Sequence, residues 1–170
     1  MIQRAVYLPP WRIDVTVRDG VGVPAPIRRL AAAIAAALEA ARAPSPASIG
    51  LILSDDRELT ELNERHMGAL GPTDVLSFPL LPPDTFPLDD SFVRPPGRRI
   101  HLGDIVVSVE RAAEQAASGR GGQTGDLRWS AADELRLLVT HGALHVCGWD
   151  HAEPAEERAM RALEQRLLGR

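Results

Sequence analysis

Eleven residues near the C-terminal end, from His141 to His151, constrain the chain more than any other stretch. They hold three of its five histidines. His141 and His145 lie four residues apart, so on a helix both side chains share one face, with Cβ atoms about 5–6 Å apart. Neutral imidazole nitrogens bind zinc at about 2.0–2.1 Å and can close on one ion from that separation. A helix is supported by the i, i+3, i+4 spacing of the preceding apolar residues, Leu135, Leu138 and Val139.

The side chain of His151 could not reach that ion if the same straight helix continued to residue 151. At about 100° and 1.5 Å per residue, it would lie about 9 Å beyond His145 and well around the cylinder. Gly148 allows the helix to end and the chain to turn back, because glycine readily adopts the left-handed conformation. Three nitrogens with one open position are typical of a catalytic zinc site rather than a structural one. We therefore expect His141, His145 and His151 to bind one Zn²⁺ per chain.

Two other side chains in this stretch have competing interpretations. Cys147 points off the ligand face two residues after His145, and we expect it to be a small buried residue. Asp150 can orient a ligand imidazole from outside the metal's own ligands, or accept a proton from a metal-bound water. Alternatively, it caps the last helix, since Asp150 and Glu153 are three residues apart. We favour the cap or the orienting role for Asp150, and no general base is assigned.

The rest of the chain alternates strand and helix patterns. Strands are predicted at 11–18, 49–53, 73–78 and 100–108, and helices at about 27–42, 55–67, 109–117 and 131–145 and from 154 onward. We expect an α+β or mixed α/β fold, in which a four-stranded mixed sheet is covered by about five helices. The helix of His141 and His145 should pack centrally. At this length, a single domain spanning 1–170 is the default.

Composition indicates the cellular environment. One cysteine excludes an internal disulfide framework and suits the reducing cytosol. The N-terminus lacks the continuous apolar core of a signal peptide, and the most apolar run, Leu30 to Leu38, is too short to cross a bilayer. We therefore expect a soluble cytoplasmic protein with no membrane partner. The oligomeric state is left open.

Charge bears on possible partners. The net charge of −4 and the isoelectric point near 5.7 do not favour nucleic-acid binding, which usually leaves a basic footprint. Any RNA contact must come from a local patch or from the metal. The densest basic cluster, Arg94, Arg98 and Arg99, lies in a long proline-rich connection at 79–99. This connection is either a solvated loop or an RNA contact.

The histidine spacing alone resembles the zinc-binding pattern of a large class of metalloproteases. In those enzymes a glutamate follows the first histidine and acts as the general base. In this chain that position is Gly142. We therefore do not expect a protease of that class.

The same stretch more closely resembles the bacterial YbeY family, whose signature is His-Gly-x-Leu-His-Leu-x-Gly-Tyr-Asp-His. His141 to His151 follows it with two mild changes, Val146 and Trp149. Further family segments match upstream and downstream in the right order: Leu62-Asn63, Pro72 to Pro79, Leu102 to Ile105, Glu134-Leu135 and Met160. The resemblance covers about Leu51 to the C-terminus. It implies a zincin-like fold with a four-stranded sheet, and zinc held by His141, His145 and His151.

The resemblance also implies an activity. Members of the YbeY family are single-strand-specific, metal-dependent endoribonucleases that act in ribosomal RNA maturation, at the 3′ end of 16S rRNA, and in ribosome quality control. The implied partners are single-stranded rRNA and the small ribosomal subunit or its proteins.

One departure from the family pattern opens a second hypothesis. The family often carries an aromatic–arginine pair after Leu-Asn, with the arginine thought important for activity. Here an ungapped count places His66 and Met67 at those positions, and Arg65 lies about 200° around the helix from Met67. This departure favours a ribosome-associated assembly factor whose metal is mainly structural. A third hypothesis, a hydrolase of another substrate such as a peptide, is disfavoured by Gly142.

Overall fold

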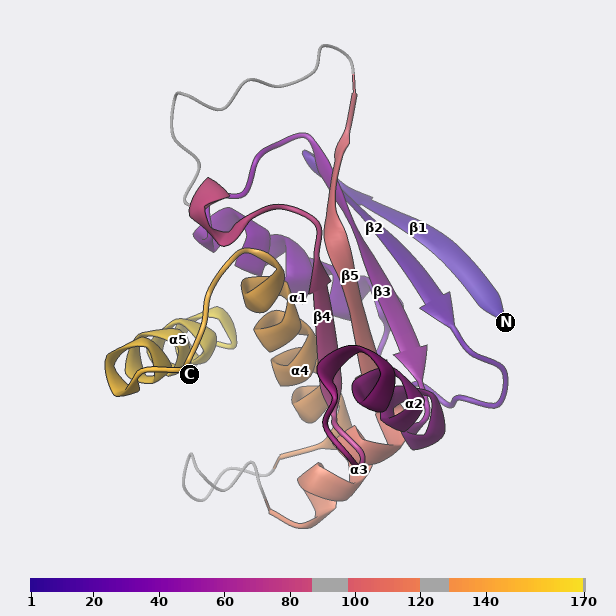
Figure 1. Ribbon diagram of the computed structural model, residues 1–170. Helices are drawn as coiled ribbons and strands as arrows, with labels where there is room; N and C mark the ends of the chain where they lie inside the picture. The colour runs from indigo at the N-terminus through magenta and orange to yellow at the C-terminus, as the bar shows by residue number, and fades with distance from the viewer. Residues whose placement is uncertain (87–97, 120–128, 170) are drawn as a thin grey trace.

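The computed structural model describes residues 1–86, 98–119 and 129–169. The described chain contains a mixed sheet and five α-helices, as predicted (Figure 1). In chain order, the elements are β1 (Ile2–Leu8), β2 (Trp11–Val17), α1 (Ile27–Ala40), β3 (Ala47–Ser54), α2 (Asp56–Met67), β4 (Val75–Pro79), the 3₁₀ turn η1 (Pro83–Thr85), β5 (Ile100–Ser108), α3 (Val109–Ala117), α4 (Ala131–Val146) and α5 (Pro154–Leu167).

The sheet in these residues has five strands, in the order β1-β2-β3-β5-β4. The three central strands run parallel, and the edge strands β1 and β4 are antiparallel to their neighbours. The prediction of four strands was therefore wrong, because it missed β1. The first four residues of β1 are exposed, so the strand lacks the alternation of a half-buried strand. Its pairing with β2, from Ile2 opposite Val17 to Leu8 opposite Trp11, is a tertiary contact.

The main core lies between one face of the sheet and the helices α1 and α4. The alternating residues of β2, Trp11, Ile13, Val15 and Val17, are buried as their pattern predicts. Helix α4 packs against α1, α3, β4 and β5, which places it at the centre of this layer. The helix that carries His141 and His145 is thus held on several sides by buried apolar residues.

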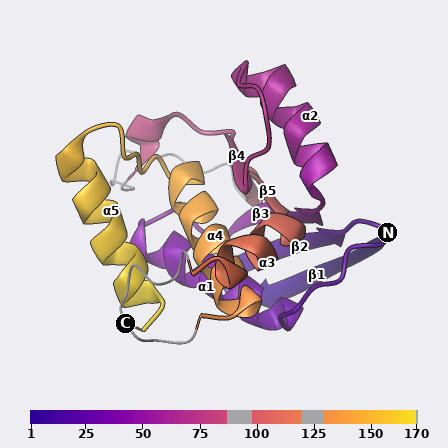
Figure 2. The same cartoon turned by 90° about the horizontal axis from the view of Figure 1, so that it is seen from below.

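Helix α2 covers part of the opposite face of the sheet (Figure 2). Three buried residues, Leu59 of α2, Leu76 of β4 and Val106 of β5, lie outside the main core cluster. Asp55 caps α2 by accepting the backbone N–H of Glu58 at 2.9 Å. None of the helices in the described ranges has the length and apolar character needed to cross a membrane.

The basic cluster predicted in the connection at 79–99 is only partly within the described residues. Arg94 lies outside them, as does most of the glycine-rich segment 118–125. Arg98 is exposed, whereas Arg99 Nη1 donates to the carbonyl oxygens of Pro10 and Ala47 at 2.7 and 3.1 Å. The guanidinium of Arg99 therefore ties the start of β5 to β2 and β3.

Candidate metal site

Helix α4 and the turn after it position the three histidines. The helix begins with a capping box: Ser130 Oγ accepts the N–H of Asp133, and Asp133 Oδ2 accepts the N–H of Ser130. It ends after Val146, and Gly148 adopts the left-handed conformation with φ 82°. A Cβ on Gly148 would also lie 2.9 Å from the carbonyl oxygen of Pro83 in η1. Glycine is therefore required here for both backbone conformation and space.

The imidazole rings of His141, His145 and His151 converge. His145 Nε2 lies 2.9 Å from His141 Nε2, and one ligand nitrogen from each of the three rings lies within 4.8 Å of the others. Tetrahedral ligands of a zinc ion at about 2.0–2.1 Å are separated by about 3.4 Å. The residues present therefore fit a metal ion. His151 is exposed while the other two are partly buried, so solvent reaches the site from the His151 side.

A fourth protein ligand is absent from the cluster in the ranges that the structure describes. Cys147 lies between two of the histidines in sequence but is buried among apolar residues, as predicted. Burial raises the pKa of its thiol to about 12, so the sulfur stays protonated at neutral pH. Since metals bind the thiolate, Cys147 is not suited to complete the site.

The surroundings of His145 keep this residue in its metal-binding form. Burial, together with the neighbouring His141 and His151, lowers the pKa of His145 to about 4. The His145 imidazole is therefore neutral across the physiological range. Neutral imidazole is the form that donates a nitrogen lone pair to a metal.

Of the two roles favoured for Asp150, the cap of the last helix was wrong. Helix α5 begins at Pro154, because proline suits the first helical position, and its N-cap is Glu153. The N–H of Glu153 donates to the Glu156 carboxylate at 3.1 Å. Asp150 lies too early to reach the helix, and its Oδ1 accepts the backbone N–H of His151 at 2.7 Å. The carboxylate thus holds the backbone of the third histidine.

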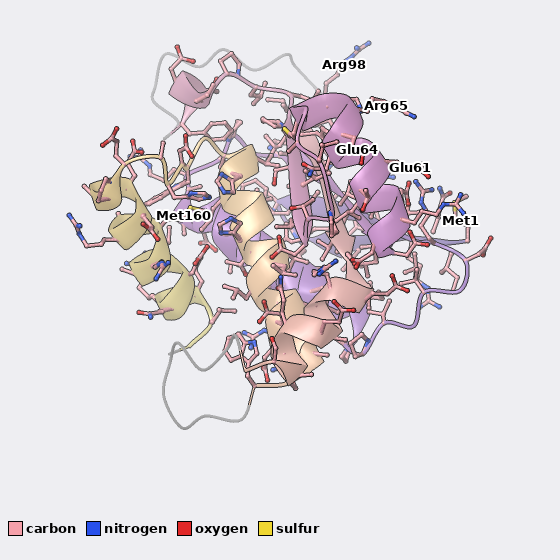
Figure 3. The ribbon with its side chains drawn as sticks, turned by 60° about the horizontal axis from the view of Figure 1, so that its bottom comes forward. Met1, Glu61, Glu64, Arg65, Arg98 and Met160 are labelled. Carbon is pink, nitrogen blue, oxygen red and sulfur yellow. The ribbon has the colours of Figure 1, made fainter. Side chains whose placement is uncertain are left out.

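Within the described residues, a ring of this cluster is contacted by the carboxylate of Glu164 in α5, which sequence reasoning missed. Its Oε1 lies 2.6 Å from His141 Nδ1, and only 8% of the residue is exposed. This contact directs the other nitrogen, Nε2, toward His145. A signal was present: Glu164 is four residues after Met160 and adjacent to Leu163, both on the buried face of α5 (Figure 3 shows Met160 on the side toward α4). A carboxylate on an apolar helix face indicates a specific partner.

Gly142, at the position of the protease base, lies where α4 meets the sheet. A Cβ there would come within 2.6 Å of Ile105 Cγ2 and 3.2 Å of Val75 Cγ2. Ser77 Oγ of β4 also donates to the Gly142 carbonyl oxygen at 3.0 Å. A glutamate cannot occupy this position unless α4 moves away from β4 and β5.

The residues at the family's aromatic–arginine positions lie at the end of α2. His66 makes an edge-on ring contact with Phe78, at 5.4 Å between centroids, and Met67 is 52% exposed. Arg65 projects from the side of α2 away from α4 (Figure 3). Arg65 is therefore not a substitute for an arginine directed at the histidines.

Comparison with protein families matches residues 20–170 to the family described as Endoribonuclease YbeY. This chain belongs to that family. The resemblance drawn from the histidine motif is thus confirmed. An Endoribonuclease YbeY from Thermobifida fusca is 39% identical over 159 residues, which cover 92% of each protein. One from Salinispora tropica is 44% identical over 129 residues, which cover 72% of this chain and 73% of the relative.

A similar fold is seen in a solved structure. The solution structure of a Thermotoga maritima protein is similar to this chain with a TM-score of 0.54. The match covers 94% of this chain and 89% of the other, at 22% sequence identity. At that identity, the likeness concerns the fold alone.

Proposed function

We propose that this chain is a metal-dependent endoribonuclease that cleaves single-stranded RNA. Membership of the YbeY family indicates an endoribonuclease, and hence a hydrolase. The observation that carries the proposal is the convergence of three histidine nitrogens within 4.8 Å, with His141 held by the buried Glu164. We assign His141, His145 and His151 as ligands of one Zn²⁺, because an all-imidazole set of three suits a tetrahedral ion with one open position.

Once bound, zinc supplies a Lewis acid for a phosphate oxygen and lowers the pKa of a coordinated water toward about 7. The chain's own residues supply position. His141 and His145 are fixed on α4, and Asp150 holds the backbone of His151. The exposed side at His151 is where an RNA phosphate can approach. Asp150 is itself exposed, but its contact with the backbone favours a positioning role over that of a general base.

The finer assignment follows the family resemblance. We place the substrate in ribosomal RNA, with roles in maturation of the 16S 3′ end and in ribosome quality control, in the cytoplasm. The small ribosomal subunit or its proteins would be the partners. We further propose that residues 1–170 act as one domain with a zincin-like arrangement, in which α4 carries two ligands next to the antiparallel edge strand β4.

The test compares RNA cleavage by matched histidine variants. Metal-loaded protein is incubated with single-stranded and duplex ribosomal RNA, beside His145→Ala and His101→Ala, and the metal content of each is measured. His101 lies on β5 and contacts Ser48 and Asp104. We expect the wild type and His101→Ala to cleave single strands, and His145→Ala to lose both metal and activity. Equal cleavage by all three would assign the activity to a contaminant and reject the proposal.

A second candidate function is a ribosome-associated assembly factor with a mainly structural metal. It is favoured by Met67 and His66 at the family's aromatic–arginine positions and by the outward direction of Arg65. Chelation separates the two candidates. Removing a structural ion should lower the unfolding free energy strongly, whereas removing a catalytic ion should abolish cleavage and leave the fold largely intact. A peptide hydrolase of the metalloprotease class is disfavoured, since Gly142 has no room for a glutamate.

A further inference from the structure

The edge of the sheet formed by β1 is open to another strand. Among the described residues, β1 pairs only with β2, and its other side has no partner. Ile2 and Tyr7 are 55% and 57% exposed, and Arg4 is the only charged residue of the strand. Soluble proteins usually protect such an edge with charges, prolines or bulges, because unpaired backbone groups attract another strand. Within β1 this protection is nearly absent.

A groove runs beside this edge. It has a volume of about 570 Å³ and lies between the β1–β2 turn and the outer side of α1. Its lining residues include Leu8, Trp11, Ala32, Ala35, Ala36 and Glu39. Because Leu8 and Glu39 line the same groove, the C-terminal ends of β1 and α1 lie together. The open strand and the outer side of α1 therefore form one continuous surface.

The outer side of α1 is self-complementary. Arg28, Ala32, Ala35 and Glu39 follow the spacing i, i+4, i+7, i+11, which places them in one line along the helix. This line is symmetric about the midpoint of α1, between Ala33 and Ile34. In a two-fold pair of antiparallel helices, Arg28 of each copy would face Glu39 of the other, and Ala32 would face Ala35. The two charge pairs then flank a centre of alanines small enough for close approach.

The strand and the helix can share one two-fold axis. The midpoint of β1 is Ala5, and seven residues of strand and fourteen of helix are both about 21–23 Å long. Helix α1 contacts both β1 and β2. Paired strands are about 4.8 Å apart, and the two-fold axis would lie midway between the two β1 strands. Because α1 lies over both β1 and β2, it would be about 5 Å to the side of this axis. The two helices would then be about 10 Å apart, within the range for packed helices.

We propose that this chain forms a two-fold dimer through the β1 edge. The β1 strands of two copies pair antiparallel around Ala5, and the α1 helices pack along the line from Arg28 to Glu39. The second copy covers Ile2 and fills the groove at Leu8. Helix α4, which carries two of the histidines, packs against β4 at the opposite edge of the sheet, so both metal sites remain accessible (Figure 1). The dimer does not depend on the proposed RNA cleavage.

Charge exchange across the axis tests the proposal. Full-length wild type, Arg28→Glu, Glu39→Arg and the double variant are compared by sedimentation velocity from low to high micromolar concentration. Each single change places two like charges face to face twice per dimer, and we expect it to shift the protein to monomer. The double change restores both pairs in reverse and should restore the dimer. Arg29→Glu is the matched control, because Arg29 is exposed but lies about 100° around the helix from Arg28.

Three results would overturn the dimer. The first is a wild type that stays monomeric over the whole concentration range. The second is a dimer that Arg28→Glu weakens no more than Arg29→Glu does. The third is a double variant that remains monomeric while its circular dichroism and unfolding free energy match those of the wild type.

Discussion

At the scale of single residues, the contact between Glu164 and His141 joins two side chains that lie 23 residues apart in the sequence. A carboxylate on the Nδ1 side of an imidazole fixes the ring and its tautomer, and thereby sets which nitrogen is offered to a metal. The 2.6 Å separation and the near-complete burial of Glu164 give this contact little freedom. Metal affinity should therefore depend on a residue that cannot itself reach the ion.

We predict that Glu164→Gln lowers zinc affinity by about 10–100-fold, the usual effect of losing such a partner. Competition with a chromophoric chelator measures the affinity directly, independently of any activity. Glu157→Gln is the control, because Glu157 is on the same helix but forms an exposed ion pair with Arg161. Equal affinities for the two variants would show that Glu164 does not position His141.

Gly142 provides a prediction about packing. In an exposed helix, Gly→Ala stabilises by about 1 kcal/mol. At Gly142 the added Cβ must displace Ile105, and such overpacking costs about 1–3 kcal/mol. We expect Gly142→Ala to lower the unfolding free energy by about 1 kcal/mol, as measured by urea denaturation. Gly22→Ala, where nothing lies within 4 Å, should have no such effect, and a Gly142→Ala variant at least as stable would contradict the close approach.

The thiol of Cys147 should be unreactive in the folded protein. Its burial raises the thiol pKa to about 12, so almost no thiolate exists at neutral pH. We expect a disulfide reagent such as Ellman's reagent to react with Cys147 only as fast as the protein unfolds. Rapid stoichiometric reaction of the native protein would mean that the sulfur is accessible.

At the scale of elements, the start of α2 is held by an ion pair to the end of β2. Arg18 Nε donates to Glu58 Oε2 at 2.8 Å, and its Nη2 donates to Oε1. The hydrogen bond from Arg18 lowers the pKa of Glu58, and the hydroxyl of Ser54 lowers it further. The ion pair therefore joins α2, on one face of the sheet, to the C-terminal end of β2.

This ion pair predicts a pH dependence of stability. Because the folded pKa of Glu58 lies below its ordinary value of 4.5, the charged form stabilises the fold above that value. The contribution is lost as pH falls through the lower folded pKa. Urea unfolding of wild type and Glu58→Gln should therefore differ at neutral pH and converge in acid. Glu61→Gln, at an exposed pair with Arg57, should follow the wild type at every pH.

Elements that carry their own periodicity could be predicted from the sequence, and those that depend on partners could not. Alternation in β2, the cap of α2 and the Ser130 cap of α4 are local patterns, and the structure contains all three. Strand β1 has no such pattern, because its partner β2 defines it. The same reason explains Glu164 and Asp150. Which carboxylate reaches the histidines depends on where α5 starts and how it packs, and Pro154 decides that start.

At the scale of the whole molecule, the histidine cluster and the open strand β1 lie toward opposite edges of the sheet. The grouping of His141, His145 and His151 was predictable, since one helix and one glycine turn bring them together. The surroundings of the cluster were not, because they are built by β4, η1 and α5 from distant parts of the chain. The motif therefore identifies the site, while the long-range packing determines its shape and support.

The last helix has a practical consequence for anyone handling this protein. Because Glu164 lies in the last turn of α5, a change that frays the end of this helix should weaken metal retention with every histidine intact. Preparations that differ only at the end of α5 should then differ in zinc content, and an inactive preparation need not be misfolded.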